Sequence, residues 1–176
     1  MIILVIMLFS CKNKIDVINS VFPFKDSIPE MIGKNIDYLE SDSGKVIVSL
    51  TSPTMKKYGG KNSLIEFPDG FKVVFYDSAM NIKSQMSADY GINLEKKRLM
   101  EAKQNVIIIN YENHEILFTE HIIWNQKKKT IFSNVPIKLI TKSDTIYGQS
   151  FESDETFSHY TIIDPSGVFI VDQEEE

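Results

Sequence analysis

Three histidines and one cysteine are the side chains of this sequence best suited to metal binding or nucleophilic chemistry. His114, His121 and His159 lie far apart in strand-like or hairpin-tip sequence, and no pair has the i, i+4 or short-loop spacing of a metal site. Cys11 has no second cysteine with which to form a disulfide or to share a metal. The sequence therefore predicts no metal site and no cofactor.

The acidic residues show no sequence pattern of catalytic pairing. Asp42, Asp69, Asp144 and Asp154 lie in turn-forming sequence, where bonding of the carboxylate to the backbone explains them. Gly59-Gly60 lacks the strand before it and the helix after it that a phosphate-binding loop needs. A pair of acids for glycoside hydrolysis stays open, because carboxylates that meet in space need not be neighbours in sequence. We expect a binding or scaffold protein with no catalytic residue, and not an enzyme.

The cysteine directly follows the long apolar run that begins the chain. Residues 2–9 are too few for a transmembrane helix, which needs about 20 apolar residues, but they have the length of the apolar core of a secretory signal. The block Leu8-Phe9-Ser10-Cys11 then has the form of a bacterial lipobox. We predict a lipoprotein signal peptide over residues 1–10, lipidation of Cys11 and a tether over residues 11–40. The alternative is that residues 1–9 form a buried strand and that Cys11 is a core thiol.

Size and charge limit the classes of partner. The chain has 176 residues, about the length of one domain, and a formal net charge of -5. This balance argues against nucleic acid as a partner, because phosphate binding needs a clustered positive field. The basic cluster at residues 127–129 falls where a hairpin tip is expected, and the acidic residues 172–176 are expected to form a solvated tail.

From Lys45 onward the sequence alternates with period two or forms short β-branched runs, as strands do. Turn-forming residues such as Pro68-Asp69-Gly70 separate these runs, and the connections are too short for crossovers between parallel strands. We expect an all-β antiparallel domain over residues 41–171, with one short helical turn before it around residues 30–39. The expected strands are 46–51, 71–76, 106–109, 115–124, 130–132, 137–141, 145–147, 160–163 and 168–171.

A weak repeat of about 30 residues runs through these strands. Segment 93–100 resembles segment 125–132, and each follows an aromatic residue and precedes an apolar strand. Segment 153–157 is a fainter third copy. Stacked units of this kind bury a continuous face that no single unit can bury alone, which favours a β-solenoid or an elongated jelly roll.

Several strands carry apolar residues on both faces, as in Val106-Ile107-Ile108-Ile109. An antiparallel sheet with one wet face should alternate cleanly, so the extra apolar positions need a second packing layer or an apolar ligand. If the ligand is an acyl chain, alternation selects a set of lining residues, although a slip of one residue in register would move the whole set to the other face. The set is Val48, Leu50, Phe75, Ile108, Phe118, Ile131, Leu139, Ile162 and Phe169.

Three segments in this order resemble the LptC family, a periplasmic component of lipopolysaccharide export, in its Bacteroidetes-type form. They are Ser41–Val46 with Leu50–Met55 and Tyr58, then Glu66–Asp77, and finally Ile146–Ser153 followed by Tyr160–Ile162. The resemblance extends over residues 36–171. It implies an elongated, twisted antiparallel β-jelly roll that is open along one side, V-shaped and lined with apolar side chains.

The same resemblance implies a function and a set of partners. A module of this family shelters the lipid A acyl chains of lipopolysaccharide, which it takes from an inner-membrane ABC transporter and passes to a periplasmic bridge protein of the same fold. The chain would then work at the periplasmic face of the inner membrane, held there by its lipid, with the outer membrane as the alternative. Well-known members are instead anchored by an uncleaved helix.

Contacts with these partners should use exposed sheet edges. We expect the last strand, Val168, Phe169, Ile170 and Val171, to face the bridge protein and the first, Val46–Leu50, to face the transporter. Gly148 is either a bend that shapes the sheet or a point of close backbone approach at a contact. The alternative function is that of a generic cell-envelope lipoprotein whose β-sandwich binds glycan or protein.

Overall fold

The computed structural model describes residues 28–60, 63–155, 157 and 159–168. Within these ranges the chain forms one antiparallel sheet of 14 strands and a single 3-10 turn, η1 (Glu95–Lys97), with no α-helix. This confirms the predicted all-β antiparallel fold. The strands are β1 (Met31–Asp42), β2 (Lys45–Tyr58), β3 (Leu64–Phe67), β4 (Phe71–Tyr76), β5 (Ile82–Ala88), β6 (Tyr90–Leu94), β7 (Leu99–Asn110), β8 (Glu115–Asn125), β9 (Thr130–Ser133), β10 (Ile137–Ile140), β11 (Thr145–Gly148), β12 (Ser150–Asp154), β13 (Tyr160–Ile163) and β14 (Ser166–Val168).

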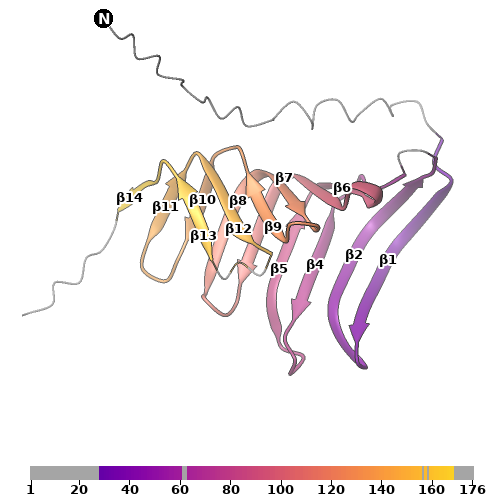
Figure 1. Cartoon of the computed structure of the whole chain (residues 1–176), viewed down its shortest axis with the longest axis horizontal. Helices are drawn as coiled ribbons and strands as arrows, with labels where there is room; N and C mark the ends of the chain where they lie inside the picture. Colours follow the sequence, from indigo (N-terminus) through magenta and orange to yellow (C-terminus); the bar gives the residue numbers. More distant parts are fainter. Residues whose placement is uncertain (1–27, 61–62, 156, 158, 169–176) are drawn as a thin grey trace, which may run out of the picture.

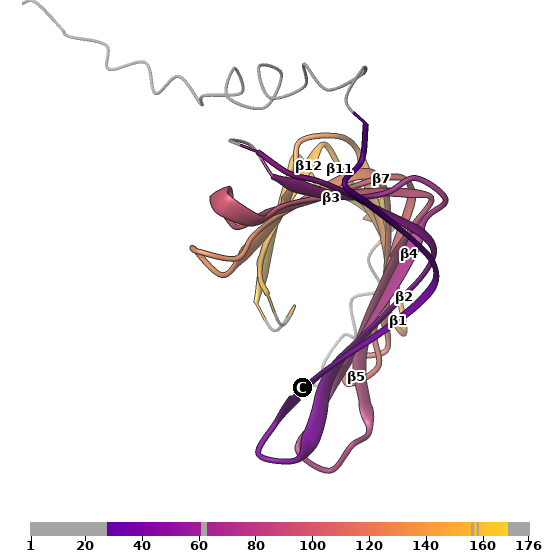
Figure 2. The same cartoon turned by 90° about the vertical axis from the view of Figure 1, so that its right-hand side faces the viewer.

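The sheet folds back on itself to make two walls joined at a corner. The first wall contains β4, β5, β10 and β11, and the second contains β3, β6, β9, β12 and β13. The long strands β2, β7 and β8 run through both walls, because one end of each pairs with first-wall strands and the other end with second-wall strands. Figure 1 shows the strands following one another along the length of the molecule, and Figure 2 shows the walls end-on as an open curve.

At the corner, two residues of β7 have positive backbone φ angles and two buried hydroxyl groups form hydrogen bonds. In β7 the pairing with β8 skips Gln104 and Asn105, whose φ values of 65° and 50° lie in the left-handed region. A bulge of this kind bends a strand and increases its twist. At the same level the hydroxyl of Thr119 lies 3.2 Å from that of Ser133 and donates to the carbonyl of Pro136 at 3.0 Å. Polar groups turned inward at the corner are thus satisfied within the protein.

The predicted repeat has a structural basis in three turns at one end of the second wall. The turn after β6 ends at Arg98 and the turn after β8 ends at Lys129, and both residues have positive φ. The amide of Gln126 donates to the carbonyl of Arg98 at 3.0 Å, and the amide of Glu155 donates to that of Lys129 at 3.1 Å. Each turn is therefore hydrogen-bonded to the next, and together they extend the sheet regularly along its length.

The N-terminal boundary of the predicted domain was wrong. Residues 31–40, which were assigned to the tether, form the 12-residue strand β1 together with residues 41 and 42. This strand pairs with β2 from Met31 opposite Lys57 to Asp42 opposite Lys45. Ser43 and Gly44 connect the two strands with φ values of 51° and 80°, the left-handed pair that favours a tight hairpin. Because β1 is paired on one side only and is mostly exposed, its sequence lacks the alternation that reveals a strand.

The hydrophobic core lies between the two walls. Its buried side chains come from β3 to β5, β7 to β10 and β12 and from Phe157, and residues at both ends of the molecule pack against it while half-exposed. Within the described part of the chain no helix has the length and apolar character needed to cross a membrane. The fully buried members include Met86, Val106 and Ile122.

Candidate functional site

The inner face of the first wall is apolar along its length. Val48 lies opposite Phe75, and Leu50 lies opposite Val73, in the pairing of β2 with β4. Directly opposed residues of antiparallel strands point to the same face, so all four side chains face the second wall. Val73 is buried, whereas Val48, Leu50 and Phe75 pack against the core but stay half-buried. The apolar inner face is therefore partly accessible at this end of the molecule.

Aromatic side chains complete this accessible region. The rings of Phe75 and Trp124 lie 6.1 Å apart, centre to centre, at an angle of 72°, so the first wall contacts the second here edge to face. Tyr38 of β1 lies opposite Leu50 and is 53% exposed. We call Tyr38, Val48, Leu50, Phe75 and Trp124 the open region.

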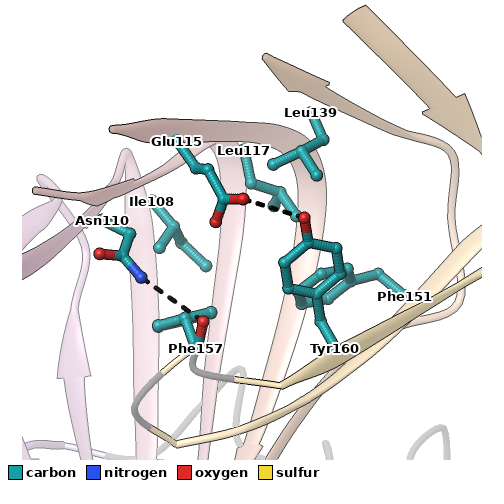
Figure 3. A pocket seen from close by; sticks show the side chains of 8 residues that line it. All are labelled: Ile108, Asn110, Glu115, Leu117, Leu139, Phe151, Phe157 and Tyr160. Carbon is teal, nitrogen blue, oxygen red and sulfur yellow. Dashed lines mark hydrogen bonds between the residues drawn. The ribbon is translucent and has the colours of Figure 1, made fainter. Parts of the chain in front are cut away.

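Further toward the C-terminal end, the interior is closed where the two walls pack together, although Ile146 and Ile162 beyond this point are half-buried. Here the first-wall residues Ile108, Leu117 and Leu139 meet the second-wall residues Phe151, Phe157 and Tyr160. The space left between them is about 20 Å³ (Figure 3). That volume is close to what a single water molecule needs and leaves no room for an acyl chain.

Two hydrogen bonds join the walls at the outer rim of the closed half, far from the corner. The hydroxyl of Tyr160 donates to Oε1 of Glu115 at 3.0 Å, and Nδ2 of Asn110 donates to the carbonyl of Phe157 at 3.4 Å (Figure 3). Burial of the phenol raises the pKa of Tyr160 to about 12, and the bond to Glu115 and its negative charge act in the same direction. Tyr160 is therefore a neutral donor at physiological pH.

The eight predicted lining residues that the structure describes fall into three groups. Val48, Leu50, Phe75 and Ile162 are half-buried against the core, while Ile108, Ile131 and Leu139 are buried within it. Phe118 differs, because its neighbours Leu117 and Thr119 are buried and its own ring lies on the outer face, 5.9 Å from Nζ of Lys138. Phe169 lies outside the described residues. Sequence alternation did not identify Tyr38 or Trp124 as part of this face, because β1 was not recognised and Trp124 was assigned to a strand end.

The outer face of the second wall carries a polar cluster that the sequence did not reveal. His121 Nε2 lies 2.6 Å from Oε1 of Glu101, and Nζ of Lys103 lies 3.0 Å from the same oxygen. Burial alone would raise the pKa of Glu101, but the hydrogen bonds and positive charges of His121 and Lys103 outweigh it and hold that pKa below its usual value. Among the described residues no three potential ligands are placed to hold a metal ion, so we interpret this cluster as structural.

The Tyr58, Glu66 and Tyr90 side chains form a second group on the same outer face. Both phenols donate to the Glu66 carboxylate, Tyr58 at 3.0 Å and Tyr90 at 2.8 Å. Burial and the neighbouring carboxylate raise the pKa of both tyrosines. These hydrogen bonds connect the end of β2 and the start of β6 to β3. Both phenols are engaged as donors, so we interpret this group as structural too.

A second hollow lies on the surface near the corner, and its lining mixes charged, polar and apolar residues. It has a volume of about 480 Å³, and β1, β2, the β3–β4 turn and the end of β5 surround it. Asp69, Lys72 and Asp89 are among its lining residues. Its mixed charge does not suit an acyl chain, so the apolar interior remains the better candidate site.

Each end of the sheet presents an edge strand. β14 pairs only with β11, through Val168 opposite Thr145 and its two preceding residues, whereas residues 169–171 lie outside the described part. At the other end β1 is the edge, because residues 48–51 of β2 pair with β1 on one side and with β4 on the other. The expectation that Val46–Leu50 is an edge was therefore wrong.

Gly148 lies where the chain passes from β11 in the first wall to β12 in the second. It is buried, and a Cβ atom there would collide with Cγ2 of Ile162. The close approach of β13 therefore requires glycine at this position.

The comparison with known families agrees with this arrangement. A family model described as lipopolysaccharide-assembly, LptC-related, matches residues 1–164. No curated protein matches the chain. Because the family match extends over nearly the whole sequence, the chain belongs to the LptC family, and so to lipopolysaccharide transport in the cell envelope.

Proposed function

We propose that this protein is a non-enzymatic carrier that shelters the acyl chains of lipid A against its apolar inner face during lipopolysaccharide export. The observation that carries the proposal is the open region, where Val48, Leu50 and Phe75 face inward yet remain half-exposed. Monomeric domains normally bury such side chains fully or cover them with a ligand or partner.

The energetics of an amphiphile support this role. Each exposed methylene of an acyl chain costs about 0.8 kcal/mol in water, so a lipid with several chains needs an apolar cover to cross an aqueous space. Walls that meet at a corner and part at the rim can cover the chains and leave the sugars in water. No bond needs to be made or broken by the protein.

The N-terminal segment supplies the anchor in this proposal. Residues 1–10 are the signal peptide, and Cys11 carries the lipid. Because β1 begins at Met31, the tether is shorter than predicted and ends before that residue. Acyl chains on Cys11 would hold the carrier at the periplasmic face of the inner membrane, each buried methylene contributing about 0.8 kcal/mol.

Edge strands at the two ends of the sheet supply the contacts for handover. An edge strand presents unpaired backbone donors and acceptors, to which a strand of a partner with the same fold can add. We propose that β1 faces the permeases of the ABC transporter and that the segment beginning at β14 and predicted to include residues 169–171 faces the bridge protein. Lipid would then pass along the inner face from β2 toward β11.

Binding of tritiated lipopolysaccharide to the purified full-length chain tests this function. We expect saturable binding that detached O-polysaccharide does not displace and that free lipid A does. Displacement by O-polysaccharide alone would refute the carrier and favour a glycan-binding lipoprotein. A readout in cells is crosslinking from Val168, which should capture a component of the export machinery.

A further inference from the structure

The interior differs between its two halves, and the difference bears on how a lipid could pass through. In the open region the inner side chains are half-buried, whereas around Phe151 and Phe157, which are 2% and 5% exposed, the space between the walls is about 20 Å³. An acyl chain that enters the open region therefore meets a packed interior further along.

The contacts that close this half lie at the rim. Glu115 begins β8 and Asn110 ends β7, so both stand at the tip of the first wall. Tyr160 begins β13, at the tip of the second wall, and Phe157 lies just before it. The bonds from Tyr160 to Glu115 and from Asn110 to Phe157 therefore span the mouth between walls that the corner joins on the other side (Figure 3).

We propose that these two hydrogen bonds form a clasp that closes the C-terminal half of the inner face to acyl chains, and that lipid reaches β11 only when the clasp opens. The inference rests on the proposed carrier function and adds to it a boundary between an open and a gated part of the path. Glu115 and Tyr160 are its central pair, because a hydrogen bond to a charged acceptor is stronger than one between neutral groups.

The aromatic rings behind the clasp explain why the walls stay together without lipid and can part when lipid is present. Parting the rim would expose Phe151 and Phe157 to water, which keeps the walls together while no lipid is present. An acyl chain that slides between the walls would cover the same rings, so lipid replaces the lost apolar contacts. An acyl chain cannot replace the two hydrogen bonds at the rim, so the free energy needed to break them determines how readily the walls part.

Tryptophan quenching can follow the two halves separately. Trp124 is the single tryptophan of the chain and reports on the open region. In a second protein, Trp124→Phe combined with Ile146→Trp places the reporter in the closed half, because Ile146 lies opposite Leu139 and packs against the core. Both proteins carry Cys11→Ser so that no acyl chain of their own is attached. The probe is 9,10-dibromostearate, whose bromine atoms quench at short range.

We expect the probe to quench Trp124 in the open region at a concentration about tenfold lower than the concentration that quenches the tryptophan at position 146. Adding Tyr160→Phe removes the donor and keeps the ring against Phe151, so the concentration that quenches at position 146 should fall about tenfold, while quenching of Trp124 changes less than about twofold. The matched control is Tyr147→Phe, an exposed tyrosine of the neighbouring β11, which should change neither value. Glu115→Ala should act like Tyr160→Phe, and unfolding midpoints confirm that each variant is folded.

Two results would overturn the clasp. One is quenching of both reporters at the same probe concentration in proteins with Glu115 and Tyr160 intact. The other is an equal response of the position-146 reporter to Tyr160→Phe and Tyr147→Phe. Failure of the carrier function looks different, because the probe would then leave Trp124 unquenched, and that result would overturn both proposals.

Discussion

Replacement of Leu50 by aspartate should separate lipid binding from folding more clearly than other single changes in the open region. Leu50 points to the inner face between Tyr38 and Val73 and is half-buried, so a bound acyl chain would cover the remainder of its side chain. Losing this apolar contact weakens the binding free energy of the lipid by about 1 kcal/mol, roughly half of what full burial of a leucine contributes. Covering the carboxylate with an acyl chain costs at least about 1–3 kcal/mol more, the penalty for an unpaired neutral polar group, because a charged group costs more than a neutral one. The sum, about 2–4 kcal/mol, corresponds to lipid binding weakened by about 30-fold or more.

The neighbouring residue Thr51 provides the matched control. It lies next to Leu50 on the same strand but is exposed and points to the outer face, opposite Lys72 and Asp37. Thr51→Asp adds the same charge there and should change lipid binding by less than about threefold. The assay is equilibrium binding of tritiated lipopolysaccharide, with urea unfolding of each variant to confirm the native state. Equal loss of binding in Leu50→Asp and Thr51→Asp would refute the assignment of the inner face as the lipid site.

Three further changes test other parts of the account. Gly91→Ala should lower the free energy of unfolding by about 2 kcal/mol in urea titrations, because its Cβ would lie 2.5 Å from Cε1 of Phe71, and an unchanged midpoint would contradict that packing. Burial raises the pKa of Glu101, but the hydrogen bonds from His121 and Lys103 lower it more, so its pKa is lower in the folded protein than in the unfolded chain. At a pH above the unfolded-state pKa, the charged carboxylate therefore stabilises the fold. That stability is lost as the pH falls below about 4.5, so the wild type should lose stability more steeply than Glu101→Gln in acid, and parallel curves would rule this out. Cys11→Ser should release the protein from membranes in cell fractionation, and unchanged membrane association would remove the lipid anchor.

The sequence predicts best where burial imposes alternation. β4 was predicted with the bounds that it has, 71–76, because its inner residues meet the core and the turn before it carries a proline and a glycine. β1 was missed because a strand paired on one side, with exposed residues on both faces, has no apolar period to detect. β5 was not expected either, since Ile82 at its start is its single β-branched residue and lysine, serine, glutamine, methionine and alanine fill the remainder.

Alternation alone could not place every residue of the candidate site. Phe118 faces outward although Leu117 and Ile108 face inward, since one residue of offset reverses the face and β8 is apolar on both faces. The bond between Glu115 and Tyr160 joins residues 45 positions apart, and no local pattern in sequence marks such a pair. The repeat was more informative, because its similar turns are those that hydrogen-bond to one another in the fold.

Site-specific photocrosslinking on adjacent residues of β2 tests the central claim most directly, since consecutive side chains of a strand point to opposite faces. A photoreactive residue at Val48 faces the inner side opposite Phe75, and one at Ser49 faces outward opposite Val74. In cells that export lipopolysaccharide, we predict strong crosslinking to lipopolysaccharide from position 48 and little from position 49. Equal crosslinking from both positions, or crosslinking from position 49 alone, would contradict a lipid path along the inner face.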